Sequence, residues 1–165
     1  MTGDSEGGNH PKSVQRVLDA AAEHGLTLEL VEYPDGTRTA VDAAAAVGCD
    51  VGQIVKSLIF AVDGELVLAL TSGANQVDTD ALTRAANGSQ CGRANADQVR
   101  ETTGFAIGGV APFGHVTPVP AFFDPALLTY ENVWAAAGTP RHVFPIAPRT
   151  LLEITGAELN DFAAG

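Results

Sequence analysis

The chain has 165 residues, of which 45% are hydrophobic and 18% charged, so it is long enough to bury one sizeable core. Its net charge is -11, and so acidic a surface argues against DNA binding or any broad groove that tracks phosphates. The same bias is equally compatible with a saline environment or with simple solubility. No apolar run reaches the ~18 residues of a membrane helix and the polar start is unlike a signal peptide, which predicts a cytoplasmic protein with no membrane partner.

The metal-binding residue types show no ligand spacing. Cys49 and Cys91 are far apart in the chain, and we expect both to be reduced thiols. His10, His24 and His142 do not cluster in sequence either. We therefore expect neither a metal nor a cofactor.

The first third of the chain alternates helical and extended patterns. Residues 1–10 are small and polar and predict a flexible N-terminal segment, followed by one domain over 11–165. Helical spacing of apolar residues begins after Pro11 and ends near Gly25. The next segments are an alternating strand over 26–33 and a short helix capped by Thr39, with Asp42 at its third position and Gly48 closing it.

The strongest local signal is a β-hairpin. Residues 55–62 and 65–73 alternate around Asp63-Gly64, a dipeptide typical of two-residue hairpin turns. Two short helices then begin at Asp or Asn and stop at Gly, over 78–88 and 95–104.

The last third is punctuated by glycine and proline. Residues 105–124 predict a strand, a loop and a second strand, and 130–138 with 141–147 predict a strand pair. Pro148 opens a final helix over 149–156. Because helices are mixed with antiparallel hairpins, the order predicts a single α+β domain with one curved, mixed, mainly antiparallel sheet surrounded by helices.

One of only two lysines, Lys56, lies inside an apolar strand, "QIVKSLIF". Alternation places Lys56 with Leu58 and Phe60 on one face and Ser57 on the other. The plain interpretation is a lysine at the start of a strand that extends its ammonium to water. The functional interpretation is a lysine at a pocket wall, holding a phosphate or carboxylate or stabilising an oxyanion.

The second candidate is "GFAIGGVAPFG", residues 104–114. Four glycines and one proline mark a backbone that turns sharply or is approached closely. Most such clusters are structural corners. The functional alternative is that amides from Gly108 to Ala111 face a cleft and hold an oxyanion or a ligand carbonyl. No nucleophile–base–orienter pattern accompanies either candidate.

These segments resemble the YbaK/EbsC family, which contains the editing domain of bacterial prolyl-tRNA synthetase and its free-standing relatives. The likeness rests on "QIVKSLIF", "DGELVLALTSGANQVD", "TTGFAIGGVAPFG" and "AAAGTP", in that order. It runs from about Leu30 to Phe162. The lysine in a V-K-[ST]-L strand followed by the G-x-x-x-P loop, here Gly108 to Pro112, is its most specific part.

The resemblance implies a trans-acting deacylase that hydrolyses a wrong amino acid from the 3′ end of a tRNA, commonly tRNA(Pro). The partners it implies are an aminoacyl-tRNA 3′ end and, as a candidate, prolyl-tRNA synthetase. By the same likeness Lys56 and Gly108 would be the catalytic residues. The expected substrate-binding residues are Tyr33, Ser57, Gly109, Val110, Ala111, Pro112 and Gly138.

The chain departs from the family members that act on cysteinyl-tRNA(Pro). Those members have a Ser-Gly-Gly-like turn and an Asp, where this chain has Ala136-Ala137-Gly138 and Val143. A less polar pocket favours another small amino acid, with alanine or serine as candidates. The alternatives are a non-catalytic module that binds a nucleotide or aminoacyl-adenosine, and an interaction domain in which Lys56 only reaches solvent.

Overall fold

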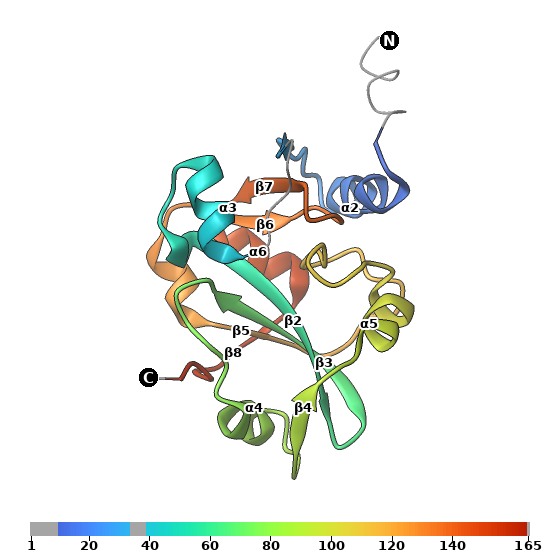
Figure 1. Cartoon of the computed structure of the whole chain (residues 1–165), viewed down its shortest axis with the longest axis vertical. Helices are drawn as coiled ribbons and strands as arrows, with labels where there is room; N and C mark the ends of the chain where they lie inside the picture. Colours follow the sequence, from blue (N-terminus) through green and yellow to red (C-terminus); the bar gives the residue numbers. More distant parts are fainter. Residues whose placement is uncertain (1–9, 34–38, 165) are drawn as a thin grey trace.

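The computed structural model describes residues 10–33 and 39–164, which form one sheet with helices packed around it (Figure 1). The helices are α2 Lys12–Glu23, α3 Ala40–Val47, α4 Thr79–Ala85, α5 Ala96–Thr103 and α6 Pro148–Thr155, with 3-10 turns η1 Val51–Gln53 and η2 Pro125–Thr129. The strands are β1 Val31–Glu32, β2 Ile54–Val62, β3 Glu65–Ser72, β4 Cys91–Arg93, β5 Ala121–Phe123, β6 Val133–Ala136, β7 His142–Ile146 and β8 Glu158–Leu159. The predicted α+β class with a mixed sheet is confirmed.

The β2–β3 hairpin crosses the middle of the sheet, whose order is β1-β7-β6-β2-β3-β5-β8, with β4 also paired to β2. Its turn places Asp63 and Gly64 at φ of 52° and 86°, the left-handed values that a two-residue hairpin turn of this type requires. The pairings β1–β7, β2–β3, β2–β4 and β6–β7 are antiparallel, and the other three are parallel. The sheet is therefore mixed.

The edge of β2 that faces away from β3 is shared by two neighbouring strands. Strand β6 pairs with it only at Ile54 and Val55, and β4 pairs with it only from Phe60 to Val62. The Ile59 carbonyl accepts a bond from the Ala94 amide just after β4, at 3.1 Å. Residues 56–58 therefore face a gap in the sheet on this edge. Lys56 and Ser57 both lie at this gap, on opposite faces of the strand.

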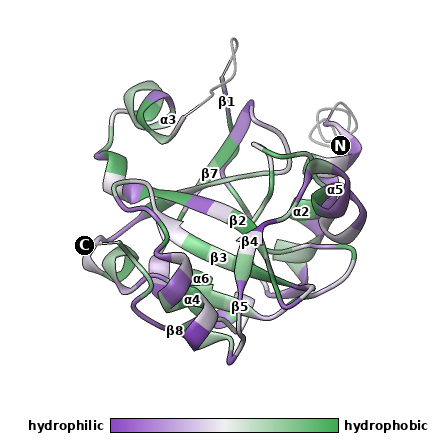
Figure 2. Ribbon diagram, turned by 60° about the horizontal axis from the view of Figure 1, so that its bottom comes forward, coloured by the Kyte–Doolittle hydropathy of each residue, from purple (hydrophilic) through white to green (hydrophobic). Residues whose placement is uncertain are grey.

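The two faces of the central hairpin are buried in different apolar clusters. Val55 and Ile59 pack in the larger cluster with Leu68 and Leu70, whereas Phe60 packs with Val67, Ala69 and Phe122 in a second cluster. Burial on both faces explains why β3 is coloured mainly towards the hydrophobic end in Figure 2. Packing on both faces of the hairpin thus fixes the backbone that carries Lys56 and Ser57 at the gap.

The predicted helix ends are confirmed where a side chain or a glycine defines them. Thr39 accepts a hydrogen bond from the amide of Asp42 at 3.1 Å, and Asn95 caps α5 by accepting from the amide of Gln98 at 2.8 Å. Gly48 ends α3 in the left-handed conformation. These signals are local, and local geometry satisfies them.

Two predicted extended segments are wrong in extent. Of the strand expected over 26–33, only Val31 and Glu32 join the sheet, and of the 105–124 pair only Ala121–Phe123 does. The segment from Phe105 to Gly109 instead passes from α5 into a turn, closed by the bond from the Gly109 amide to the Ala106 carbonyl. The predicted flexible segment 1–10 lies outside the described residues, apart from His10. No helix within 10–33 and 39–164 has the length and apolar character to cross a membrane.

Candidate active site

A cavity of about 490 Å³ lies at the gap beside β2. The residues on its sheet side include Ile54, Lys56 and Leu58, which share one face of β2 by strand alternation. Strand β6 adds Trp134 and β7 adds Val143, which pack with Ile54 in a third apolar cluster beneath α3. The cavity is therefore built on the sheet and not on a surface loop.

Two walls rise from this floor. Helix α3 and its cap contribute Thr39, Ala40, Val41 and Ala43. The opposite wall consists of residues from the loop after α5 and from the β6–β7 turn: Ile107, Gly108, Val110, Thr139 and Pro140. Val41 and Ile107 are 66% and 50% exposed, unusual values for large apolar side chains. The two walls thus present apolar side chains to solvent around the cavity.

Among the described residues that line the cavity, Lys56 alone carries a charge. It is partly buried, and its Nζ donates a hydrogen bond of 2.5 Å to the carbonyl of Asn75. Burial lowers the pKa of the ammonium, the positive charge of Arg93 lowers it further, and the carboxylate of Asp124 acts in the opposite direction. A partly desolvated ammonium at the cavity gains more from an anion than an exposed one does.

The glycine loop packs against the β6–β7 turn. Gly108 lines the cavity with φ of 93°, a left-handed value that favours glycine. A Cβ added to Gly109 would lie 2.6 Å from the Cα of Thr139, so only glycine lets the two backbones approach so closely. The Gly109 amide donates to the carbonyl of Ala106 at 2.9 Å and is used within the turn.

The structure brings together four of the residues singled out from the sequence: Lys56, Ser57, Gly108 and Val110 all line the cavity. Ser57 Oγ is buried and has no hydrogen-bond partner among the described residues. Five others do not line it: Tyr33, Gly109, Ala111, Pro112 and Gly138. A direct contact of any of these residues with a ligand stays a prediction.

Those five residues occupy supporting positions. The Tyr33 hydroxyl donates to the carbonyl of Ala43 in α3 at 3.3 Å, and burial raises the pKa of the phenol to about 12. Gly138 packs against the backbone of Ser13 in α2. The Ala111 carbonyl bonds His115 Nε2 at 2.6 Å, and Gly109 and Pro112 complete the same loop.

Sequence reasoning missed the α3 wall, Trp134, and the acceptor for Lys56. The α3 helix ends nine residues before the lysine in sequence and carries no polar motif, so no pattern connects the two. For the β6–β7 turn a signal existed, because the strand pair predicted over 130–138 and 141–147 requires a turn at Gly138-Thr139-Pro140. Asn75 contributes through its backbone carbonyl, which no residue type reveals.

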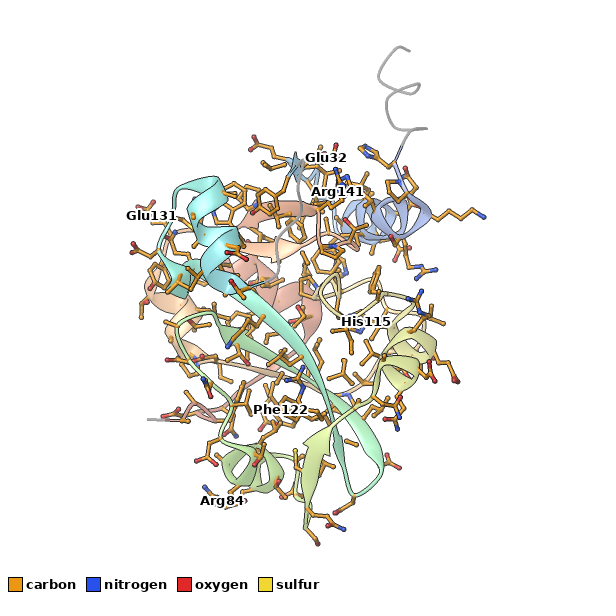
Figure 3. All side chains as sticks on the ribbon, viewed as in Figure 1. Glu32, Arg84, His115, Phe122, Glu131 and Arg141 are labelled. Carbon is orange, nitrogen blue, oxygen red and sulfur yellow. The ribbon has the colours of Figure 1, made fainter. Side chains whose placement is uncertain are left out.

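A Thr–His–Glu arrangement borders the cavity but is built as a turn. Thr139 Oγ1 lies 2.7 Å from His142 Nδ1 and also accepts a bond from the Arg141 amide at 3.0 Å. Glu32, 4.0 Å from His142 Nε2, also lies beside Arg141 (Figure 3). Thr139 accepts from the backbone two residues on, as in a Ser/Thr turn, and the 4.0 Å between Glu32 and His142 is too long for the hydrogen bond that would orient a catalytic base.

The chemistry available at the cavity is electrostatic. One ammonium and a glycine-containing backbone face an apolar space, which suits an anionic or ester-bearing ligand with a small apolar group. No group of three or more His, Cys, Asp or Glu side chains that could hold a metal occurs within 10–33 and 39–164. The fold and the cavity together describe an α+β domain whose cavity is lined by one cation and a glycine-containing backbone segment.

The chain belongs to the aminoacyl-tRNA editing domain family, whose sequence model matches residues 34–154. It is 48% identical to a solved structure of a candidate trans-editing enzyme for prolyl tRNA synthetase, with a TM-score of 0.89 over 95% of this chain and 100% of the other. The predicted family resemblance is therefore confirmed.

Curated relatives include free-standing proteins and parts of larger enzymes. The uncharacterised protein YwhH of Bacillus subtilis is 26% identical over 77% of this chain and 81% of its own length. The proline–tRNA ligase of Maridesulfovibrio salexigens is 34% identical over 66% of this chain, which corresponds to only 18% of the ligase. The candidate Cys-tRNA(Pro)/Cys-tRNA(Cys) deacylase EbsC of Enterococcus faecalis is 24% identical over 74% of this chain and 76% of its own length.

Proposed function

We propose that this protein is a trans-acting deacylase that hydrolyses mischarged aminoacyl-tRNA, with tRNA(Pro) carrying a small wrong amino acid as the substrate. The observation that carries the proposal is that Lys56 and Gly108, far apart in sequence, line one cavity. Family membership and the likeness to a candidate trans-editing enzyme support it. Such a substrate implies a cytoplasmic protein, and prolyl-tRNA synthetase is the partner that would deliver it.

The proposed reaction needs no protein nucleophile. A water oxygen attacks the ester carbonyl, the carbonyl oxygen becomes negative, and the bond to the terminal ribose oxygen then breaks. The proton from the water ends on the ribose oxygen that leaves. Lys56 and the backbone at Gly108 and Val110 would stabilise the negative oxygen or hold the neighbouring phosphate. Tyr33, Gly109, Ala111, Pro112 and Gly138 belong to the proposal as residues that shape the pocket.

Binding restricted to the single-stranded 3′ end is compatible with the acidic chain. Arg93 lies close enough to Lys56 to lower its pKa, and its guanidinium carbon lies 5.5 Å from the Phe60 ring centroid. Two cations therefore gather on one part of a protein whose net charge is -11. A local pair of cations suits one or two phosphates and not a duplex.

The amino acid removed is proposed to be small and weakly polar. Ala136 and Val143 both line the cavity and pair with one another across β6 and β7. Leu58, Trp134 and Ile54 extend this apolar surface. Because Val143 replaces the aspartate of the members that act on cysteinyl-tRNA(Pro), we propose alanine or serine as the amino acid removed. Apolar pockets separate small substrates by only ~1–3 kcal/mol.

A deacylation panel tests the proposal. Purified protein is added to tRNA(Pro) and tRNA(Ala) charged with alanine, serine, cysteine or the cognate amino acid, and ester loss is compared with buffer alone. Lys56→Ala should abolish the acceleration, whereas Lys12→Ala, which changes the only other lysine at an exposed position, should retain it. Saturable binding that depends on Lys56 without turnover would instead establish the non-catalytic binding module.

A further inference from the structure

Asp124 is a buried carboxylate that the proposed reaction does not use. It is 2% exposed and precedes η2, where its Oδ1 accepts a bond from the Ala126 amide at 2.9 Å. A neutral Asn or Ser caps a helix start nearly as well as Asp does, and burying a carboxylate costs free energy that such a residue avoids. The cap alone therefore does not account for a charge at this position.

The other oxygen of Asp124 anchors the turn that follows β3. Its Oδ2 accepts bonds from the Ser72 amide at 3.1 Å and from the Asn75 side-chain amide at 2.9 Å. The backbone amide of Asn75 donates to the Ser72 carbonyl at 2.9 Å, and Ser72 Oγ donates to the Gly52 carbonyl at 2.8 Å. One carboxylate thus holds both ends of the Ser72–Asn75 turn.

That turn presents the acceptor for the lysine of the cavity. The Asn75 carbonyl receives the hydrogen bond from Lys56 Nζ, so the position of the ammonium depends on where Asp124 holds Asn75. The charged groups that act on Lys56 are Arg93 on β4 and Asp124 itself, with opposite signs. Asp124 is therefore connected to Lys56 both by a chain of hydrogen bonds and by its charge.

We propose that Asp124 is a positioning residue for the deacylation proposed above, on which this inference rests. Its carboxylate anchors the Ser72–Asn75 turn so that the Asn75 carbonyl holds the Lys56 ammonium at the cavity. Its negative charge offsets Arg93 at that ammonium. The substrate and the water need not touch Asp124 for it to act in this way.

The test combines Asp124→Asn with a direct observation of Lys56. Asn is nearly isosteric and can still cap η2, but it lacks the charge. Because the chain has only two lysines, protein labelled with ¹³C-lysine gives one signal for Lys56 and one for Lys12, which is the internal control. In Asp124→Asn we expect the Lys56 signal to titrate at lower pH than in wild type, while the Lys12 titration stays unchanged.

Activity gives the second measurement. We expect kcat of Asp124→Asn to fall on the order of 10²-fold near neutral pH, the scale of a misplaced catalytic group. After subtraction of the uncatalysed rate, the alkaline limb of its pH–rate profile should move to lower pH, because Lys56 then loses its proton earlier. Asn75→Ala keeps the backbone carbonyl and the carboxylate and removes one hydrogen bond, so we expect a loss of about five-fold.

The outcomes separate the two proposals. A folded Asp124→Asn protein with an unchanged Lys56 titration, and a rate loss no greater than its unfolded fraction, would show that Asp124 only caps η2. If Asp124→Asn does not fold, Asn75→Ala decides, and an unchanged rate and Lys56 signal in that variant would overturn the inference. A wild type without deacylase activity would refute the proposed function, whereas the lysine titrations would still test the link from Asp124 to Lys56.

Discussion

Replacing Gly109 by alanine is expected to distort the cavity, although Gly109 itself does not line it. The added Cβ would lie 2.6, 2.8 and 2.9 Å from the Cα, C and N atoms of Thr139, all of them backbone atoms that cannot rotate away. The loop and the β6–β7 turn must therefore separate. Forced overpacking of this kind costs about 1–3 kcal/mol. In a chain of this size that corresponds to a fall in Tm of roughly 2–12 °C.

Two other glycines provide matched controls. A Cβ at Gly92 in β4 meets no atom within 4 Å and its φ is unstrained, so Gly92→Ala should leave Tm unchanged or raise it by a few degrees. A Cβ at Gly108 meets only Pro140, at 3.7 Å, but the residue has φ of 93°, so Gly108→Ala should cost about 1 kcal/mol through backbone strain alone.

Calorimetry and deacylation kinetics together test this reasoning. Because Thr139 and Pro140 line the cavity wall, Gly109→Ala should lower kcat/KM well below the value for Gly92→Ala at temperatures where both are folded. Equal Tm and equal kcat/KM for the Gly109 and Gly92 variants would refute the close packing of the loop on the β6–β7 turn.

Three further predictions concern single side chains. Ser57→Ala removes a buried hydroxyl that lacks a partner, so urea unfolding should show equal or higher stability, by up to ~1 kcal/mol, while deacylation falls several-fold if that hydroxyl bonds the substrate. Burial lowers the pKa of His115 in the folded chain. Below about pH 6.5, the ordinary pKa of histidine, the unfolded chain therefore binds a proton at this residue that the folded chain binds only at lower pH. Tm should fall as pH drops from 7 towards 5, and His115→Gln should reduce that fall. Val143→Ala enlarges the cavity, so kcat/KM for 2-aminobutyryl-tRNA relative to alanyl-tRNA should rise about 10-fold. An unchanged ratio would exclude Val143 from the amino-acid pocket.

The parts of the fold that were predicted from sequence are those fixed by neighbours in the chain. Asp63-Gly64 defines its own hairpin, and Thr39 and Asn95 cap helices within three residues. The errors concern pairing across the sheet. Residues 26–30 alternate strictly, yet β7 pairs only with Val31 and Glu32. Alternation shows that a segment is extended but not how much of a partner strand it meets.

The candidate site divides in the same way. Lys56 could be singled out because an ammonium in an apolar strand needs an explanation, and the glycine loop because its composition marks unusual backbone. Asp124 could not, since an aspartate before Pro125 reads as an ordinary helix cap. Its link to Lys56 runs through Asn75, 49 residues away in sequence, and exists only in the folded chain.

The central claim is that the aminoacyl end of a tRNA occupies the cavity between Lys56 and the glycine loop. A non-hydrolysable 3′-aminoacylamino-adenosine carrying alanine can be titrated into protein labelled with ¹⁵N and ¹³C-lysine. We predict that the Lys56 signal and the amides of Ser57, Gly108 and Val110 shift saturably, while Lys12 and Gly92 do not. Shifts that avoid these four residues and gather elsewhere on the molecule would contradict the claim.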